Sequence, residues 1–267
     1  IAVIDLSDFT LATVYTLTTT DALAQAVAIA PDNRTVIVCD YYNDRIIFGA
    51  VDPTNPAAGL PTENTIDTGS GPINVAISPD GRTALVANAD NDTVSVFEIT
   101  GPGVVAAGAT PTVSGLPGGE QSIAFAPSGQ RAYVVSYTPH PDQLSWLRIN
   151  GPGDVTLGGA GVANLLSHMS SGFFGVDVLA VTPDGSSALV GNTGDSITPC
   201  SDVALVNLST WAVTAIDTNS NSPAGLDIIR QQYGVTIPTL TEWGVVILFL
   251  LTMSAGLSLI RRRRLPT

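Results

Sequence analysis

Short apolar segments recur along the chain, and each begins a unit that is punctuated by a proline-containing turn. The first segment of a unit alternates apolar and polar residues, as around Val75 and Ile77, and runs into a turn such as "SPDG". The second, such as "TALVA", is continuously apolar, and the third, such as "VSVFEI", follows a polar loop. Alternation predicts a strand with one buried face, whereas a short continuous apolar run suits a strand buried on both faces. The pattern therefore predicts an all-β chain of strands and tight turns, with a weaker fourth strand in each unit.

The unit occurs four times, which makes it an internal repeat. The four copies cover residues 26–52, 74–101, 122–151 and 178–210, and their turns begin at Pro31, Pro79, Pro127 and Pro183, with spacings of 48, 48 and 56 residues. Repeats of about 40–50 residues built from strands and turns are typical of β-propeller blades. A single blade cannot bury both of its faces, so we expect the blades to stack around an axis.

These repeats predict a β-propeller over residues 1–232, with four-stranded blades near 26–70, 71–118, 119–172 and 173–222. Residues 223–230 resemble the first strand of a further blade, and residues 1–17 resemble the last strands of one. We expect Ile1 to Leu6 to pair in the blade that begins with Gly225 to Ile229, which would close the ring and remove its edges. This gives about five blades. The N-terminal residues resemble a strand that is already in mid-pattern. If residues precede them in the natural chain, the blade number would be larger.

The second copy carries the resemblance to a known family. "SPDGRTALVANADNDTVSVFEI" resembles the YVTN-type β-propeller repeat, and the likeness extends more loosely over residues 1–230. Such propellers are common in secreted and surface proteins of bacteria and archaea. The resemblance implies the fold more than an activity, because one fold serves many functions.

The C-terminal segment has a different pattern. Trp243 to Ile260 are 18 residues without a charge, followed by Arg261, Arg262, Arg263 and Arg264. As a helix this run would be about 27 Å long, enough to cross the hydrocarbon core of a bilayer. Arginines stay on the cytoplasmic side of a membrane, so residues 261–267 would be a cytoplasmic basic tail and the propeller would be periplasmic or extracytoplasmic on an inner membrane. The alternative is a buried core helix, which four terminal arginines disfavour.

The linker 233–242 and the start of that segment resemble a sorting signal. Ile237, Pro238, Thr239 and Leu240, then Trp243 and Gly244, match the IPTL-CTERM tail of Gram-negative bacteria in order. The resemblance implies recognition by an exosortase-type membrane protease that cuts near the motif. Two expectations stay open: a retained anchor that packs against helices of other membrane-protein subunits, or a cleaved address.

The net charge of the chain limits the classes of partner that it can bind. The chain has 23 acidic residues against ten basic ones, all of them arginine, and a net charge of −13. So acidic a chain predicts no nucleic-acid partner, since phosphates would be repelled.

Cys39 and Cys200 are the two cysteines of the chain. They fall in loops of different predicted blades, and we expect no disulfide between them, because such a bond needs Cα atoms within about 7 Å.

The inventory of reactive groups is small. His140 and His168 are the two histidines, and neither has a metal ligand at suitable spacing. No nucleophile-elbow, zinc or phosphate-loop motif is present, and no cofactor is predicted.

The polar loops after the second strands are the candidate sites, because equivalent loops gather on one face of a propeller. Asp40, Asp44, Asp90 and Asp92 offer oxygen atoms to Ca²⁺, although such turns commonly use these side chains to satisfy their own backbone. Tyr41, Tyr42, Tyr137 and His140 are candidate partner contacts.

Together these observations predict a non-enzymatic, membrane-anchored propeller that acts as a binding or scaffold module, as an accessory subunit of a larger membrane complex. The first alternative is a cell-surface protein sorted and processed by an exosortase. The second is a propeller enzyme of the lactonase or quinoprotein type.

Overall fold

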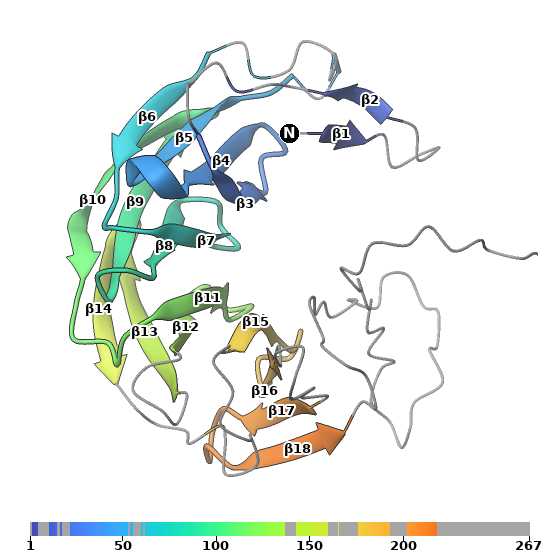
Figure 1. The fold of residues 1–267 in the computed structure, drawn as a ribbon, viewed down its shortest axis with the longest axis vertical. Coiled ribbons are helices and arrows are strands. Elements are labelled where there is room, and N and C mark those ends of the chain that lie inside the picture. Colours follow the sequence, from blue (N-terminus) through green and yellow to red (C-terminus); the bar gives the residue numbers. More distant parts are fainter. Residues whose placement is uncertain are drawn as a thin grey trace, which may run out of the picture.

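The computed structural model describes most of the repeat region (Figure 1). The described residues are 2–4, 11–14, 17, 22–52, 54–55, 60, 62–136, 143–159, 165, 176–192 and 202–217. The predicted membrane segment, the IPTL motif, residues 223–230, Tyr137, His140, His168 and Cys200 lie outside these ranges. No helix within the described ranges has the length and apolar character needed to cross a membrane.

The described residues form four antiparallel four-stranded sheets, so the all-β, propeller-like part of the prediction is confirmed. The first blade holds β3 (Ala24–Ile29), β4 (Thr35–Asp40), β5 (Arg45–Ala50) and β6 (Asn64–Asp67). The second holds β7 (Pro72–Ile77), β8 (Thr83–Asn88), β9 (Thr93–Gly101) and β10 (Val104–Val113). The third holds β11 (Glu120–Phe125), β12 (Arg131–Ser136), β13 (Gln143–Gly151) and β14 (Asp154–Gly159). The fourth holds β15 (Val176–Val181), β16 (Ser187–Asn192), β17 (Asp202–Asn207) and β18 (Val213–Asp217).

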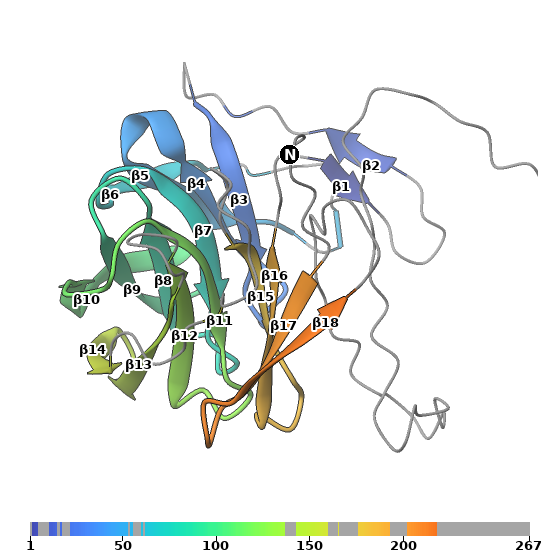
Figure 2. The ribbon, with the colours of Figure 1, turned by 60° about the horizontal axis from the view of Figure 1, so that its bottom comes forward.

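The four blades follow one another along an arc, with β3, β7, β11 and β15 on its inner side (Figure 1). Figure 2 shows the same strands from a second direction, where the blades stand side by side. A short antiparallel pair, β1 (Ala2–Ile4) and β2 (Leu11–Val14), lies apart from these sheets, near the first blade. We call the face with the loops after the second strands the upper face, and the face with the proline turns the lower face.

The core lies between blades rather than within one. Ile37 and Cys39 of the first blade pack with Val86 and Phe97 of the second, and all four side chains are at most 2% exposed. Full burial of such an aliphatic side chain stabilises the fold by about 1.5–3 kcal/mol. The sequence had suggested that Cys39 lies in a loop, but it belongs to the buried strand β4. Burial raises the pKa of its thiol to about 12. Because Cys200 is not described, the absence of a bond between the two stays a prediction.

The proline turns repeat one backbone geometry. Asn33, Gly81, Gly129 and Gly185 all have positive φ, between 56° and 73°. This is the left-handed region that glycine and asparagine enter most easily, which explains why each turn ends in glycine or asparagine, in the sequences Pro-Asp-Asn, Pro-Asp-Gly and Pro-Ser-Gly. The turns also stack between blades, since a Cβ on Gly81 would lie 3.3 Å from the Pro31 ring. Each turn glycine thus faces the turn proline of the preceding blade.

A second lower-face contact joins the same blades. The Gly103 N–H donates to the Thr35 hydroxyl at 2.9 Å, and the Gly153 N–H donates to the Thr83 hydroxyl at 3.0 Å. Each threonine begins the second strand of its blade and is at most 1% exposed, and each glycine lies in a Gly-Pro-Gly turn of the next blade. We call this contact the threonine latch.

Candidate functional site

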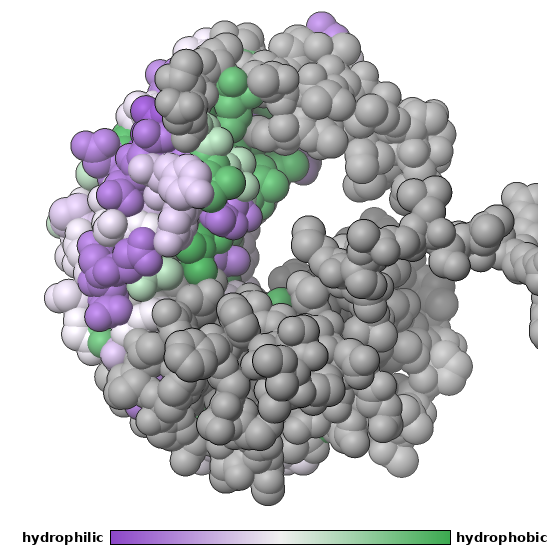
Figure 3. Space-filling view, in the orientation of Figure 1, coloured by the Kyte–Doolittle hydropathy of each residue, from purple (hydrophilic) through white to green (hydrophobic). Residues whose placement is uncertain are grey.

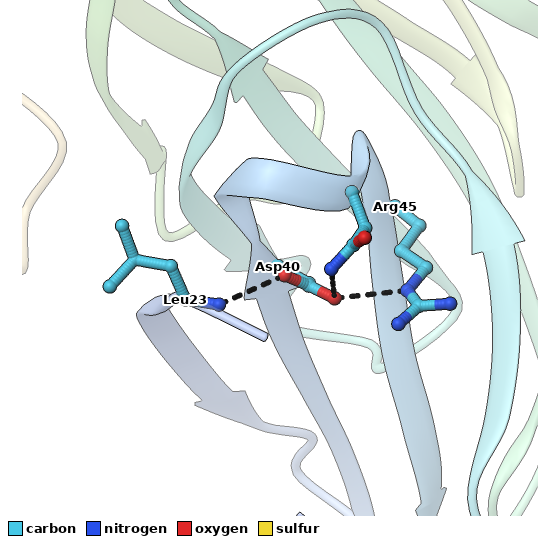
Figure 4. A network of polar contacts seen from close by, with 4 residues as sticks. Leu23, Asp40 and Arg45 are labelled. Carbon is cyan, nitrogen blue, oxygen red and sulfur yellow. Dashed lines mark hydrogen bonds and ion pairs between the residues drawn. The ribbon is translucent and has the colours of Figure 1, made fainter. Parts of the chain in front are cut away.

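Asp40 ends strand β4 on the upper face and is fully buried. One carboxylate oxygen accepts a hydrogen bond from the Leu23 N–H at 3.1 Å (Figure 4). The other accepts from the Asn43 amide and from Arg45 Nε, both at 2.9 Å. A buried carboxylate is tolerated when it is paired and hydrogen-bonded in this way. Asp40 therefore fixes the loop start and is not a free oxygen ligand.

Tyr41 and Asp90 meet across the boundary between the first two blades. Tyr41 begins the 3-10 turn η1 (Tyr41–Asn43), and its hydroxyl donates to an Asp90 carboxylate oxygen at 3.0 Å. This hydrogen bond, with the nearby negative charge, raises the pKa of Tyr41, so the phenol stays protonated at neutral pH. Asp90 is exposed. The pair is a solvent-accessible carboxylate oriented by a phenol.

Tyr42, the next residue, points to solvent and is 71% exposed. Its ring packs edge-on against Tyr41, with 5.8 Å between the centroids. Tyr42 thus offers open aromatic surface, as expected of a contact residue, whereas the Tyr41 hydroxyl is already engaged.

Asp44 and Asp92 bind the backbone of the following blade. The Asp44 carboxylate accepts a hydrogen bond from the Gly71 N–H at 2.9 Å, and Asp92 accepts one from the Gly119 N–H at 2.8 Å. Both aspartates have left-handed backbones, with φ of 50° and 57°. The sequence pattern had suggested turns that satisfy their own backbone or ligate a metal. Instead, these carboxylates join neighbouring blades.

The aspartates do not form a metal centre in the structure. Within the described ranges, no group of three or more histidine, cysteine, aspartate or glutamate side chains is placed to hold a metal ion. Asp40, Asp44, Asp90 and Asp92 each have their own hydrogen-bond donor. The contact that sequence reasoning missed is Tyr41 with Asp90. The sequence signal for this contact was that the polar loop of the first repeat, which holds Tyr41, recurs in the second repeat, where it holds Asp90.

Comparison with known proteins bears on this face directly. Residues 5–102 match the family described as "Lactonase, 7-bladed beta-propeller". The matched segment contains the upper-face loops of the first two blades, and with them Tyr41 and Asp90. No relative was found among the curated proteins.

Solved propeller structures share the fold. Hydrazine synthase of Kuenenia stuttgartiensis is 19% identical with a TM-score of 0.62, and the match covers 84% of this chain and 63% of that one. A Bacteroides fragilis protein provisionally named a 6-phosphogluconolactonase is 20% identical with a TM-score of 0.56, covering 81% of this chain and 63% of that one. A Lactobacillus plantarum protein is 18% identical with a TM-score of 0.58, covering 84% and 65%. The chain thus spans less than two thirds of the length of these structures.

The lactonase match corrects the prediction that the chain is not an enzyme. That prediction rested on the absence of histidine-based and linear motifs. A propeller can assemble acid–base groups from loops of different blades, which no linear motif reveals. Tyr41 and Asp90, 49 residues apart, form such a juxtaposition.

Proposed function

We propose that this chain is a hydrolase of the lactonase type that opens a cyclic ester on its upper face. The observation that carries the proposal is the lactonase match over residues 5–102, which includes both members of the Tyr41–Asp90 pair. Aspartate is among the side chains that act as a general base on water, and Asp90 is both accessible to water and held in place by its hydrogen bond from Tyr41. The lactonase-type alternative from the sequence thereby replaces the scaffold reading.

The reaction needs one water molecule and no redox step. The Asp90 carboxylate takes a proton from water as the water oxygen bonds to the lactone carbonyl carbon. The ring C–O bond then breaks, and the proton passes from Asp90 to the departing ring oxygen, which gives a hydroxy acid. Tyr41 is a positioning residue in this scheme, because its hydroxyl donates to the Asp90 carboxylate and holds it in place.

Charge argues for an uncharged sugar lactone rather than a phosphorylated one. Arg45 is the arginine on the upper face within the described ranges, and its Nε is engaged by the buried Asp40. The chain as a whole carries a net charge of −13, which would repel a phosphate group. We therefore propose δ-gluconolactone as the model substrate, with its 6-phosphate as the competing one.

The test is whether the full chain hydrolyses the lactone. The reaction is monitored by the acid that it releases, titrated at constant pH. Asp90→Asn should lower kcat/KM by about 100-fold or more, the usual contribution of a positioned general base. Tyr41→Phe should lower it less, and Tyr42→Phe is the matched control that should leave it unchanged. Two results would overturn the proposal. One is lactone hydrolysis no faster than the uncatalysed rate, and the other is a kcat/KM of the Asp90→Asn variant equal to that of the parent.

We further propose that the enzyme works outside the cytoplasmic membrane, tethered there as a single-pass protein. Support comes from the sequence, namely the uncharged run 243–260 followed by four arginines. Mass spectrometry of the protein from native membranes decides between the two forms of the tail. A product that extends to Thr267 supports the anchor, and one that ends near Thr239 supports exosortase processing.

A further inference from the structure

The boundary between the third and fourth blades departs from the pattern of the other two. Arg131 begins strand β12, at the position that Thr35 and Thr83 occupy in the first two blades. The threonine latch is therefore replaced here. Arg148 lies directly opposite Arg131 in the β12–β13 pairing, where the earlier blades pair threonine with Ala50 or Glu98.

Two arginines directly opposite one another are an unfavourable arrangement in a sheet, because like charges repel. The arrangement is more unexpected because basic residues are scarce in this acidic chain. The described ranges contain five arginines, namely Arg34, Arg45, Arg82, Arg131 and Arg148. Within those ranges the ion pair that forms is Arg45 with Asp40, so neither Arg131 nor Arg148 has a carboxylate partner there. Both are exposed.

One tryptophan ring, that of Trp146, contacts both guanidinium groups. The Arg131 guanidinium carbon lies 4.5 Å from the centre of the Trp146 ring, and that of Arg148 lies 5.9 Å away. Such cation–π contacts order the side chains without neutralising their charge. Gly158 makes room for the ring, since a Cβ there would lie 2.4 Å from it.

A strained residue completes the cluster. Trp211 of the fourth blade has a φ of 60°, which is an outlier for so bulky a side chain. Its ring packs edge-on against Tyr133, with 6.3 Å between the centroids. Tyr133 and Trp146 share one face of the third blade with the two arginines, because alternate residues of a strand point the same way. A strained backbone and a pair of like charges both lower stability. Their occurrence together indicates a functional site, because proteins tolerate such unfavourable features mainly where function requires them.

We propose that Arg131 and Arg148, with Trp146 and Trp211, form a docking site for an acidic segment of a partner protein. Guanidinium groups pair with carboxylates through two parallel hydrogen bonds, and two of them side by side suit a run of glutamate or aspartate. Arginine and tryptophan are also the residues that most often dominate binding energy at protein interfaces. The site lies at the lower ends of β12 and β13, away from the upper-face pair proposed for lactone hydrolysis, and is independent of that function.

Hexaglutamate, with hexaglutamine as the neutral comparison, is the probe for this site in the full-length protein. Binding is followed by tryptophan fluorescence and calorimetry at fixed ionic strength. We expect hexaglutamate to bind and hexaglutamine not to bind. Arg131→Gln and Arg148→Gln should each weaken binding about tenfold, as expected from losing a charged hydrogen bond. Arg82→Gln removes the same charge from the lower face of the second blade, away from these rings, and should leave binding unchanged.

Thermal unfolding separates binding from a structural role. Arg148→Gln relieves like-charge repulsion and should leave the melting temperature unchanged or higher. Loss of stability with unaltered hexaglutamate binding would overturn the proposal. So would equal weakening by Arg82→Gln, or tighter binding of inorganic sulfate or a single-stranded oligonucleotide than of hexaglutamate.

Discussion

The Asp44 carboxylate of the first blade accepts a 2.9 Å hydrogen bond from the Gly71 N–H of the second. Asp92 and Gly119 repeat the relationship between the second and third blades at 2.8 Å. Each aspartate has a left-handed backbone, and its side chain reaches the next blade. Hydrophobic packing between blades is non-directional, so these bonds help fix how neighbouring blades are oriented.

Replacement of Asp92 by alanine should lower the free energy of unfolding by about 1–3 kcal/mol. The Gly119 N–H would lose its acceptor, and alanine tolerates the left-handed backbone poorly. Asp92→Asn is the matched control, because asparagine keeps an acceptor oxygen and enters this backbone region more easily. Urea unfolding of both variants tests the idea, and equal losses for the two would contradict it.

Ser95 and Ser145 occupy equivalent positions in the second and third blades but have different surroundings. The Ser95 hydroxyl accepts hydrogen bonds from the Gly69 N–H and the Asn88 amide, both at 3.0 Å. Pro117 stands where Gly69 stands one blade earlier, and proline has no N–H to donate. Within the described part of the chain, the buried Ser145 hydroxyl accordingly has no hydrogen-bond partner.

The two serines should respond differently to the same substitution. Ser95→Ala should cost about 1–3 kcal/mol, because the half-buried Gly69 N–H and the buried Asn88 amide both lose an acceptor. Ser145→Ala should change stability by less than about 0.5 kcal/mol, since it removes a polar group that makes no bond to the protein. Denaturant unfolding measures both, and a Ser145→Ala loss as large as that of Ser95→Ala would refute the comparison.

The repeat of strands was predictable because hydrophobic alternation and turn chemistry are local properties. The positive φ of Asn33 and Gly81 in the proline turns could be expected from residue type, because asparagine and glycine adopt this conformation most easily. The role of the aspartates was not predictable in the same way. Asp44 and Asp92 stand at one repeat position, but their acceptor role depends on where Gly71 and Gly119 lie in the next blade.

Contacts between residues far apart in the chain depend on strand register and blade packing, which the sequence does not show. Arg131 and Arg148 are 17 positions apart, and only the pairing of β12 with β13 places them opposite each other. Tyr41 and Asp90 belong to different blades, so their contact depends on blade packing. The missing enzyme motif misled the functional prediction for the same reason. A motif search sees neighbours in the chain, whereas these groups are neighbours only in space.

Acid should weaken the proline turns first. Hydrogen bonds from the Thr182 hydroxyl and the Ser186 N–H lower the pKa of Asp184 below its ordinary value of 3.8. At Asp80, burial raises the pKa, but bonds from Ser78 and Arg82 outweigh it, and the pKa is again lowered. A carboxylate with a lowered folded-state pKa stabilises the fold above its unfolded pKa and loses that effect as the pH falls through the folded value.

The loss of melting temperature on acidification from pH 6 to pH 3 should therefore be smaller in an Asp80→Asn/Asp184→Asn variant than in the unaltered protein. At pH 6 the variant should be the less stable of the two, because asparagine lacks the charge that strengthens these bonds. Asp67→Asn, at an exposed strand position, is the control. Parallel melting curves for variant and parent across this pH range would show that the turns do not carry the acid sensitivity.

Val27 tests how the ring closes. Its counterparts Val75, Ile123 and Leu179 in the later inner strands are 5–8% exposed, whereas Val27 is 53% exposed. Ile29, two residues further along the same strand, is 62% exposed. Figure 3 shows hydrophobic surface along this inner side of the arc. The outer part of the same blade face is covered, since Leu17 and Leu60 pack on Val38 and its neighbours.

If residues 223–230 and 1–17 form the closing blade, Val27 becomes an interblade side chain like Val75. Val27→Ala should then cost about 2 kcal/mol, close to the cost of Val75→Ala, because both substitutions would remove buried methyl groups. If the face stays open to water, Val27→Ala should cost only a few tenths of a kcal/mol, which reflects strand propensity. We expect equal costs for the two variants in denaturant unfolding of the full chain. A large loss for Val75→Ala alone would mean that the closing blade does not cover the first blade.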